Sequence, residues 1–243
     1  DAALRRPFRS PHHSASAAAL IGGGSDPRPG EASLAHGGVL FLDELPEFSR
    51  HCLEVLREPM ESGLVTISRA RHKLSYPASF QLIAAMNPCP CGYLGSQRCD
   101  CSAEKIARYQ KKISGPILDR IDLHIPVNNI DNRQLIQGKN NHKEASNFDI
   151  RKRVCKARDL QVQRQGIVNA RLDNQQLKKV CPLNSQLQNF LEKAINSYSL
   201  SARGYHRLLK VARSIADLSA IEAPDIAQYQ EALSYRGQFN VTK

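Results

Sequence analysis

The sequence has 243 residues, 41% of them hydrophobic, and a formal net charge of +11. It contains no run of about 18 apolar residues, and its first thirty residues lack the zones of a signal peptide, which argues against a membrane span and against secretion. Four of its seven Cys fall within thirteen positions, so a metal site in a reducing compartment explains them better than a disulfide framework. We therefore expect a soluble, cytoplasmic protein.

The positive charge is concentrated toward the C-terminus. Residues 1–146 carry 18 basic and 15 acidic side chains, whereas residues 147–243 carry 16 and 8. Such an excess fits a partner rich in phosphate, although a basic surface without a partner has the same composition. Charge alone leaves nucleic-acid binding open.

The first elements are short. Pro and Gly interrupt residues 1–37, where only one helix, at about Ser14 to Leu20, is expected. The apolar run Val39 to Leu42 then has the length and composition of a strand buried on both faces.

Strands and helices alternate over the next eighty residues, which indicates a parallel α/β sheet. In chain order we expect a helix capped by Ser49 that ends at Gly63, a hairpin from Leu64 to Tyr76, a buried strand from Phe80 to Met86, a Cys-rich loop from Pro88 to Cys101, a helix from Ala103 to Ile113 and a strand from Ile121 to Val127.

After a polar linker at 128–146, the pattern becomes helical only. Apolar side chains recur at helical spacing from Leu183 to Tyr198 and from Leu208 to Leu218. The sequence thus predicts an α/β domain over 1–127 and a helical domain over 147–243. Further helices are expected near 147–165, 173–181 and 224–236.

A strand that delivers two adjacent carboxylates is the strongest single motif. Gly38-Val-Leu-Phe-Leu-Asp43-Glu44 places them at the carboxyl end of the strand, where open α/β sheets bind ligands. This is the form of a Walker B strand, in which the first carboxylate holds hydrated magnesium and the second polarises the attacking water. The alternative is a strand end with two solvated acids.

Other motifs follow one another along the chain. They are Phe8-Arg-Ser-Pro-His-His-Ser, Gly22-Gly-Gly, Pro29-Gly-Glu, Met86-Asn-Pro-Cys-Pro-Cys-Gly, Ser114-Gly-Pro-Ile-Leu-Asp-Arg and Ser201-Ala-Arg-Gly-Tyr-His-Arg. Together with the Walker B strand, they resemble the magnesium-chelatase-like branch of the AAA+ ATPases over nearly the whole chain. The resemblance implies a P-loop NTPase core, an all-α lid, and the use of ATP and Mg²⁺.

The resemblance also implies roles for three polar residues. Asn87 matches sensor 1, which reaches the γ-phosphate or its attacking water. Arg120 matches the arginine finger that projects into the neighbouring subunit's site, and Arg203 matches sensor 2, which couples the lid to the nucleotide. Without the resemblance, Asn87 is an ordinary strand-end residue, Arg120 belongs to a surface ion pair and Arg203 is solvated.

The predicted hairpin has a basic tip. In helicases of this branch, a hairpin before the sensor 1 strand points into the central pore. Here the tip carries Arg69, Arg71, His72 and Lys73, cations that can follow a DNA backbone without reading its sequence. The alternative is a solvated, charged turn.

Two Cys pairs can close a tetrahedral thiolate site. They are Cys89-x-Cys91 and Cys99-x-Cys101. Because all four ligands would be protein sulfurs, we expect a structural zinc ion. The one-residue gaps are tighter than those of common zinc fingers, so a different pairing is the alternative.

Other Cys and His residues are expected to be structural. Loop packing or hydrogen bonding explains His12 and His13 better than metal binding does. Small apolar fillers are expected at Cys52, Cys155 and Cys181.

The phosphate-binding loop of the family is missing. None of the 14 Gly stands in a Gly-x-x-x-x-Gly-Lys-[Ser/Thr] pattern. In the resembled proteins that loop precedes the Phe8 segment, so we expect a C-terminal fragment that does not hydrolyse ATP by itself.

The resemblance implies a function for the whole motor. It would be a homohexamer that drives branch migration of DNA and helps incoming strands to integrate during natural transformation. Two alternatives remain: a magnesium-chelatase motor subunit, and a zinc-stabilised module that binds DNA or protein without ATPase activity.

Overall fold

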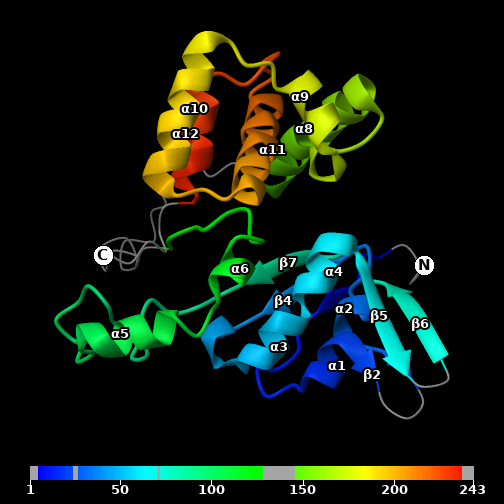
Figure 1. Ribbon diagram of the computed structural model, residues 1–243, viewed down its shortest axis with the longest axis vertical. Coiled ribbons are helices and arrows are strands. Elements are labelled where there is room, and N and C mark those ends of the chain that lie inside the picture. The colour runs from blue at the N-terminus through cyan, green and yellow to red at the C-terminus, as the bar shows by residue number, and fades with distance from the viewer. Residues whose placement is uncertain (1–4, 24–26, 70–71, 128–145, 237–243) are drawn as a thin grey trace. The chain divides into compact units, whose positions relative to one another are not determined.

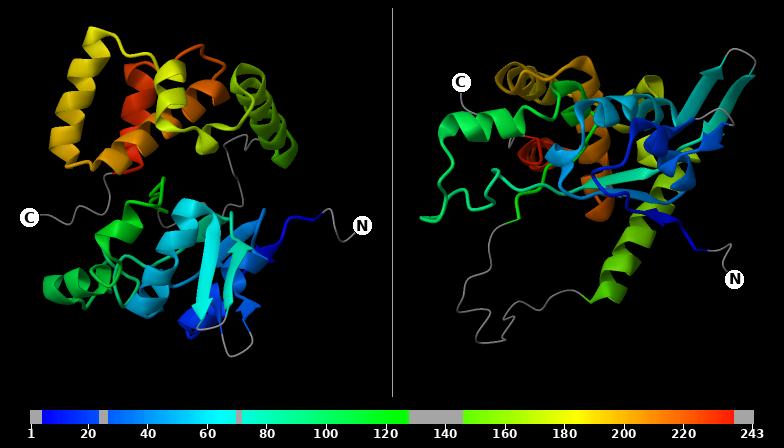
Figure 2. Two further views of the ribbon diagram at one scale, coloured as in Figure 1. Left: turned by 45° about the vertical axis from the view of Figure 1, so that its right-hand side comes forward. Right: turned by 90° about the horizontal axis from the view of Figure 1, so that it is seen from below.

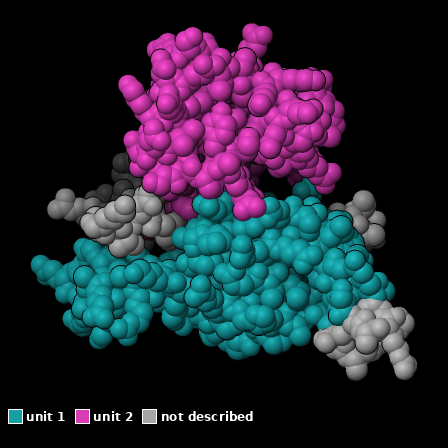
Figure 3. Space-filling model, in the orientation of Figure 1, with its two compact units in different colours: residues 1–121 teal, residues 122–243 magenta. Residues whose placement is uncertain are grey.

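The computed structural model describes residues 5–23, 27–69, 72–127 and 146–236 (Figure 1). The chain divides into two compact units, Asp1–Ile121 and Asp122–Lys243, which Figure 3 colours separately. The first unit mixes strands and helices, and the regular elements described in the second are all helices. The predicted order, an α/β core followed by a helical part, is confirmed.

Three parallel strands form the sheet of the first unit. They are β1 (Phe8–Arg9), β4 (Val39–Leu42) and β7 (Gln81–Ala84), and β4 lies in the middle. Phe8 pairs with Val39, and Val39 pairs with Gln81. This register brings the carboxyl ends of all three strands to one edge of the sheet.

The core of the first unit lies on one face of this sheet. Leu40 and Leu42 are fully buried and belong to the core cluster, whereas Phe41 lies outside it. On the other face Phe8 is 62% exposed and Ile83 is 41% exposed. The predicted burial of Val39 to Leu42 on both faces is therefore wrong for one face, because the described helices of this unit supply apolar side chains to the other face.

Four short helices supply that core. Ser16 and Ser49 cap the first and third of them, each accepting a backbone N–H bond through its hydroxyl oxygen. The predicted helix from Ser49 to Gly63 is confirmed, although it is divided at Leu56. The helices are α1 (Ala17–Ile21), α2 (Glu31–Leu34), α3 (Arg50–Val55) and α4 (Arg57–Ser62).

Two hairpins flank the sheet. The predicted one is confirmed as β5 (Leu64–Arg69) paired antiparallel with β6 (His72–Pro77), and it projects away from the sheet in the right view of Figure 2. A second, unpredicted one pairs β2 (Gly22–Gly23) with β3 (Arg28–Pro29). The Tyr76 hydroxyl donates to the carbonyl of Pro27 at 2.8 Å, which ties the two hairpins together.

A 3₁₀ turn at Leu45–Glu47 lies between β4 and α3.

The segment after β7 contains a predicted strand that the structure does not have. Helices α5 (Ala103–Gln110) and α6 (Gly115–Leu118) follow the Cys-rich loop. The predicted strand from Ile121 to Val127 is wrong. Its apolar residues alternate, but Val127 is 90% exposed, and the backbone N–H of His124 donates to the carbonyl of Tyr235 rather than to a strand.

In residues 146–236, the main described part of the second unit, five α-helices are found, and all five were predicted. Capping boxes begin α8, α9 and α12, which explains why their starts could be placed from sequence. Leu187, Leu191, Leu208 and Tyr229 lie in a common core. The helices are α8 (Asn147–Gln165), α9 (Asn174–Val180), α10 (Ser185–Tyr198), α11 (Ala202–Leu218) and α12 (Ile226–Ser234), with a 3₁₀ turn at Asn169–Arg171.

A buried polar network joins these helices. The carboxylate of Asp217, 4% exposed, accepts bonds from Arg213 at 2.7 Å, Arg164 at 2.6 Å and Asn169 at 2.8 Å. Burial opposes ionisation of Asp217, but the bonds from Arg164, Asn169 and Arg213 outweigh it and lower its pKa. Among the described helices, none is long and apolar enough to span a membrane.

Candidate functional site

The edge of the sheet gathers polar residues from three strands. The loop after β1 carries His13, β4 ends directly before Asp43 and Glu44, and β7 ends three residues before Asn87. The ladder continues past β4, because Ala85 donates to the carbonyl of Leu42 at 3.0 Å and Leu45 donates to that of Ala85 at 2.9 Å. The structure thus brings together the residues that the sequence predicts at this edge.

The two carboxylates of the Walker B motif differ in geometry. Asp43 is exposed, and its Oδ1 accepts the backbone N–H of Glu44 at 2.8 Å. Glu44 has left-handed backbone angles, φ 50° and ψ 47°. Both carboxylates are exposed, so they remain open to a cation or a water molecule.

His13 is a residue of this edge that sequence reasoning did not assign to it. Its Nδ1 lies 3.0 Å from Oε2 of Glu44, and its ring packs edge-on against Phe48. His13 therefore contacts the second Walker B carboxylate, a partner that the expectation of loop packing or hydrogen bonding did not name. The signal that could have found it is the Phe8–Arg9 strand, whose parallel pairing with β4 places its following loop beside the end of β4.

Asn87 stands exposed where β7 runs into the Cys-rich loop. The loop returns to it through Gly92, which has φ +80°. A Cβ atom built on Gly92 would lie 3.8 Å from Cγ of Asn87. The Cβ direction of Gly92 therefore points toward the Asn87 side chain, and an added methyl group would come into van der Waals contact with it.

The four Cys of this loop converge. Their Sγ atoms all lie within 4.8 Å of one another. Sγ of Cys89 lies 3.4 Å from that of Cys91 and 3.9 Å from that of Cys99, and the Cys91–Cys99 separation is 3.7 Å. Because a tetrahedral site with Zn–S bonds of about 2.3 Å has S–S edges of about 3.8 Å, the four sulfurs already have the dimensions of such a site.

The thiols of this cluster differ in acidity. A backbone hydrogen bond from Tyr93 is the main cause that lowers the pKa of Cys91 to about 7. The backbone of Cys101 lowers that of Cys99, but burial and the neighbouring thiols Cys91 and Cys89 raise it to about 11. Of the three other Cys, Cys52 and Cys181 are buried as expected, whereas Cys155 is exposed, so its prediction as a core filler is wrong.

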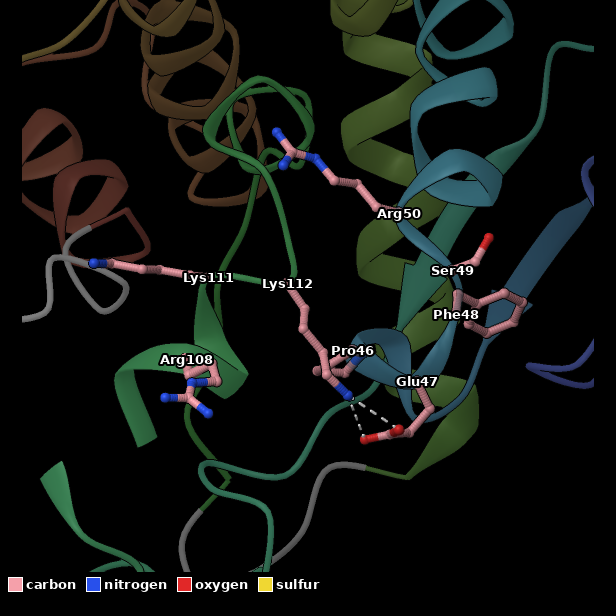
Figure 4. Close-up of a pocket in the computed structure, with 8 residues that line it drawn as sticks. All are labelled: Pro46, Glu47, Phe48, Ser49, Arg50, Arg108, Lys111 and Lys112. Carbon is pink, nitrogen blue, oxygen red and sulfur yellow. Dashed lines mark hydrogen bonds and ion pairs between the residues drawn. The ribbon is translucent and has the colours of Figure 1, made fainter. Parts of the chain in front are cut away.

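Helix α5 lies between the Cys cluster and the carboxylates. Burial is the main cause that raises the pKa of Tyr109, and the negative charges of Glu47, Cys89 and Glu44 add to it. Lys112 lies 3.2 Å from Oε2 of Glu47 and 5.5 Å from the centre of the Tyr109 ring. Figure 4 shows Lys112 reaching Glu47, whereas Lys111 and Arg50 extend away from that pair. The pocket in this view is lined by Pro46, Glu47, Phe48, Ser49, Arg50, Arg108, Lys111 and Lys112.

The structure describes only part of the basic hairpin tip. Lys73 is exposed. The backbones of Arg69 and His72 pair across the end of the hairpin, and their side chains lie outside the description. Arg71 lies outside the described residues. The hairpin itself has the predicted position, before β7.

Arg120 lies inside its own unit. Its side chain is 5% exposed, with Nη2 at 2.5 Å from Glu61 and Nη1 donating to the carbonyl of Pro116 at 2.7 Å. The predicted projection toward a neighbouring subunit is thus not seen in this structure. A role as an arginine finger would require the guanidinium to leave Glu61.

Arg203 belongs to the helical unit. It is exposed in the first turn of α11, whose N-cap Ser201 accepts the backbone N–H of Gly204 at 3.0 Å. Its position in the first turn matches the predicted start of a lid helix.

Comparison with known proteins identifies the family. The model for magnesium chelatase, subunit ChlI, matches residues 1–135, and that for its C-terminal part matches residues 144–236. The chain is 49% identical over 232 residues to competence protein ComM of Haemophilus influenzae and 47% identical over 236 residues to the uncharacterized protein YifB of Escherichia coli.

These matches cover nearly all of this chain but only part of each relative. Both cover 96% of this chain, but only 45% and 46% of the relatives, so the chain spans about half their length. The chloroplastic magnesium-chelatase subunit ChlI of Oryza sativa is 37% identical over 60 residues, which are 25% of this chain and 14% of that protein. With both family models and the α/β-plus-helical architecture in agreement, the chain belongs to the magnesium chelatase family of AAA+ proteins.

Proposed function

We propose that the chain is the Walker B, sensor, arginine-finger and lid portion of an ATP-driven DNA motor. The observation that carries the proposal is the shared strand edge, where Asp43, Glu44 and Asn87 come from neighbouring parallel strands. Ligands of open α/β sheets bind outside such an edge. The family also supports the use of a nucleotide and of Mg²⁺.

The exposed carboxylates suit a hard cation. Magnesium prefers oxygen ligands and keeps several waters, and when bound with ATP it neutralises phosphate charge. Asp43 would hold this hydrated ion through its carboxylate. Glu44 would orient and polarise the attacking water while His13 fixes its Oε2. Asn87 would donate a hydrogen bond to the γ-phosphate or to that water.

Two arginines complete the proposed reaction. Arg203 would sense the nucleotide bound to its own subunit. Arg120 would act in trans in a homohexamer, after exchanging Glu61 for the phosphate of the neighbouring site. A planar guanidinium matches carboxylate and phosphate equally well, so this exchange keeps its bonding geometry.

The test is ATP turnover by the full-length gene product that carries this chain. The 243 residues contain no Walker A pattern, so we expect no turnover from them alone. In the full-length product we expect magnesium-dependent turnover that Glu44→Gln lowers by about 100-fold or more. Glu58→Gln is the matched control, because Glu58 is exposed on α4. Equal effects of the two substitutions would exclude the assignment of Glu44.

DNA is the proposed partner, and branch migration during natural transformation is the proposed process. The support is the basic hairpin, the excess charge of residues 147–243 and the similarity to a competence protein. If Arg69, Arg71 and Lys73 contact phosphates, replacing all three with Ala should make the slope of log affinity against log salt shallower by about 2 to 3. Replacing Lys178, Lys179 and Lys193 instead, three exposed lysines of the helical unit, should change the slope less, because they add to the general positive charge and not to the proposed hairpin contact. If the hairpin substitutions and the lysine substitutions changed the slope equally, DNA would be attracted by the overall positive charge without a contact to the hairpin.

Zinc is the proposed metal of the Cys cluster, in a structural role. Four sulfurs at tetrahedral spacing leave no open coordination position for water. Cobalt(II) titration of the chain should produce a sulfur-to-metal absorption band at one ion per chain. The band should lose intensity in Cys99→Ser, which leaves three sulfurs, and keep its intensity in Cys155→Ser, which changes an exposed Cys outside the cluster. A band of unchanged intensity in both variants would show that the ion binds elsewhere.

Two other functions have specific support. The family description and the rice relative favour a chelatase-type motor, which would hydrolyse ATP without stimulation by DNA. The four converging sulfurs fit a zinc-stabilised binding module, for which the 243 residues alone would bind DNA and the full-length gene product would show no turnover.

A further inference from the structure

The Cys cluster lies directly beside Asn87. Cys89 follows Asn87 by two residues and is fully buried, whereas Asn87 itself is exposed. Within the described residues the Asn87 side chain makes no hydrogen bond, so hydrogen bonding does not fix the orientation of its amide. The neighbouring backbone is then what can limit the orientations open to it.

One of those neighbours is part of the cluster. The backbone N–H of Gly92 donates to the carbonyl of Cys89 at 3.1 Å, which closes a tight turn containing Cys91. The same turn places the Cβ direction of Gly92 at 3.8 Å from Cγ of Asn87 and 3.9 Å from its Nδ2 and Oδ1. Because Gly92 directly follows Cys91, a displacement of the Cys91 sulfur also shifts the backbone of Gly92 next to Asn87.

A second restraint comes from the other Cys pair. Nε2 of Gln110 donates to the carbonyl of Pro88 at 3.1 Å, so α5 holds the residue that follows Asn87. Helix α5 begins at its N-cap Ser102, which directly follows Cys101. One Cys pair therefore sets the turn beside Asn87, and the other sets the start of the helix that holds Pro88.

The loop between the pairs has little structure of its own. Its described backbone bonds are single turns, such as Ser96 to Tyr93 at 3.0 Å and Cys99 to Ser96 at 3.2 Å. Tyr93 and Leu94 are 51% and 43% exposed, so few apolar contacts hold the loop in place. An ion bound by all four sulfurs would join the two restraints into one closed unit.

We propose that metal binding by Cys89, Cys91, Cys99 and Cys101 positions the Asn87 side chain at the strand edge. The Cys cluster is thus a positioning site, whose loading state sets the orientation of Asn87. This inference rests on the proposed role of Asn87 in ATP turnover.

The first test measures the orientation of Asn87 in the full 243-residue chain. The side-chain amide of Asn87 is observed by nitrogen-15 NMR with cadmium(II), a closed-shell substitute for zinc, and again after chelation. We expect one sharp amide pair with the metal and a shifted or broadened pair without it. The amide of Asn169, buried in the helical unit, is the internal control and should not change.

Variants separate positioning from general folding. Cys99→Ser should reproduce the metal-free Asn87 signal, and Cys155→Ser should not. Because Cys99→Ser could also unfold the loop, Gly92→Ala provides a second route. It keeps all four sulfurs but adds a methyl group toward Asn87 at a strained positive φ, so the Asn87 signal should shift while the metal remains bound. The proposal would be overturned if the NMR signal of the Asn87 amide changed neither with metal nor with Gly92→Ala. It would also be overturned if the chain bound no metal through these sulfurs.

The second test uses the full-length gene product. Asn87→Ala and Cys99→Ser should each lower kcat about tenfold or more with little effect on KM, and the double variant should fall no lower than the weaker of the two. Independent, multiplying losses would overturn the proposal while leaving the ATPase function intact. Absence of turnover in the unmodified product would instead refute the proposed function, and the NMR result would stand by itself.

Discussion

In the helical unit the polar side chains with the most bonds are buried and held by one another, whereas in the α/β unit the polar residues at the sheet edge are exposed. Asp217 accepts bonds from three side chains and is 4% exposed. Asp43, Glu44 and Asn87 are all exposed, and the only side-chain ion pair among them joins Glu44 to His13 within the described residues. The first arrangement stabilises a fold, and the second leaves hydrogen-bonding capacity for a ligand. The residues that stabilise the helical unit through bonds and the residues left exposed at the sheet edge are therefore two different sets.

The largest effect should come from breaking the buried network. Asp217→Ala leaves Arg213 buried without its carboxylate and should lower the free energy of unfolding by about 3–5 kcal/mol. Chemical denaturation followed by helical circular dichroism measures it. Asp159→Ala, which removes an exposed carboxylate from α8, should change it by less than about 0.5 kcal/mol. If the two losses are equal, the network does not carry the stability assigned to it.

The same network predicts how the free energy of unfolding falls at acidic pH. Because the folded-state pKa of Asp217 is lowered below its unfolded value of about 3.9, its contribution is complete above that value and is lost as pH falls through the folded pKa. Unfolding free energies measured from pH 6 down to 2.5 should therefore fall less steeply in Asp217→Asn than in the unmodified chain. Asp159→Asn should keep the original slope, and a slope unchanged in both would remove Asp217 as the cause.

Two adjacent glycines should separate packing from backbone strain in the α/β unit. A Cβ on Gly38 would collide with the carbonyl of Pro7, whereas a Cβ on Gly37 meets nothing within 4 Å but stands at φ +72°. We expect Gly38→Ala to cost about 1–3 kcal/mol more than Gly37→Ala, which costs about 1 kcal/mol by strain alone. Thermal unfolding measures both. A smaller loss for Gly38→Ala would mean that β1 does not need its pairing with β4.

The smallest effect on stability is expected at the carboxylates. Glu44→Gln should change the free energy of unfolding by no more than about 0.5 kcal/mol, because the pair with His13 is exposed. Glu31→Gln, which breaks a pair with Arg9 at 2.6 Å in the same unit, is the comparison and should cost more. A large destabilisation by Glu44→Gln would contradict the separation of stability from chemistry.

Local signals made much of this molecule predictable. The buried strand before Asp43, the Ser49 cap, Gly63 and the capping boxes each act within a few residues, and each stands where the sequence places it. The convergence of the four Cys was also predictable, because both pairs lie in one short loop.

What could not be predicted depends on distant partners. Strand β1 has two residues between prolines and exists only through β4, so the meeting of His13 with Glu44 was missed. Arg120 is buried by Glu61, which lies 59 residues earlier in the chain. The alternation in residues 121–127 indicated a strand, but pairing requires a neighbour, and the described structure provides none there.

The left-handed backbone of Glu44 lowers the stability of the folded chain. A β-carbon in that conformation costs about 1 kcal/mol, and Asn tolerates it better than Glu does. Glu44→Asn should therefore relieve part of this cost, even though it shortens the side chain and removes the carboxylate proposed to polarise water. A search for more heat-resistant variants of this protein would thus favour the replacement of Glu44, and resistance gained in that way would come with loss of turnover.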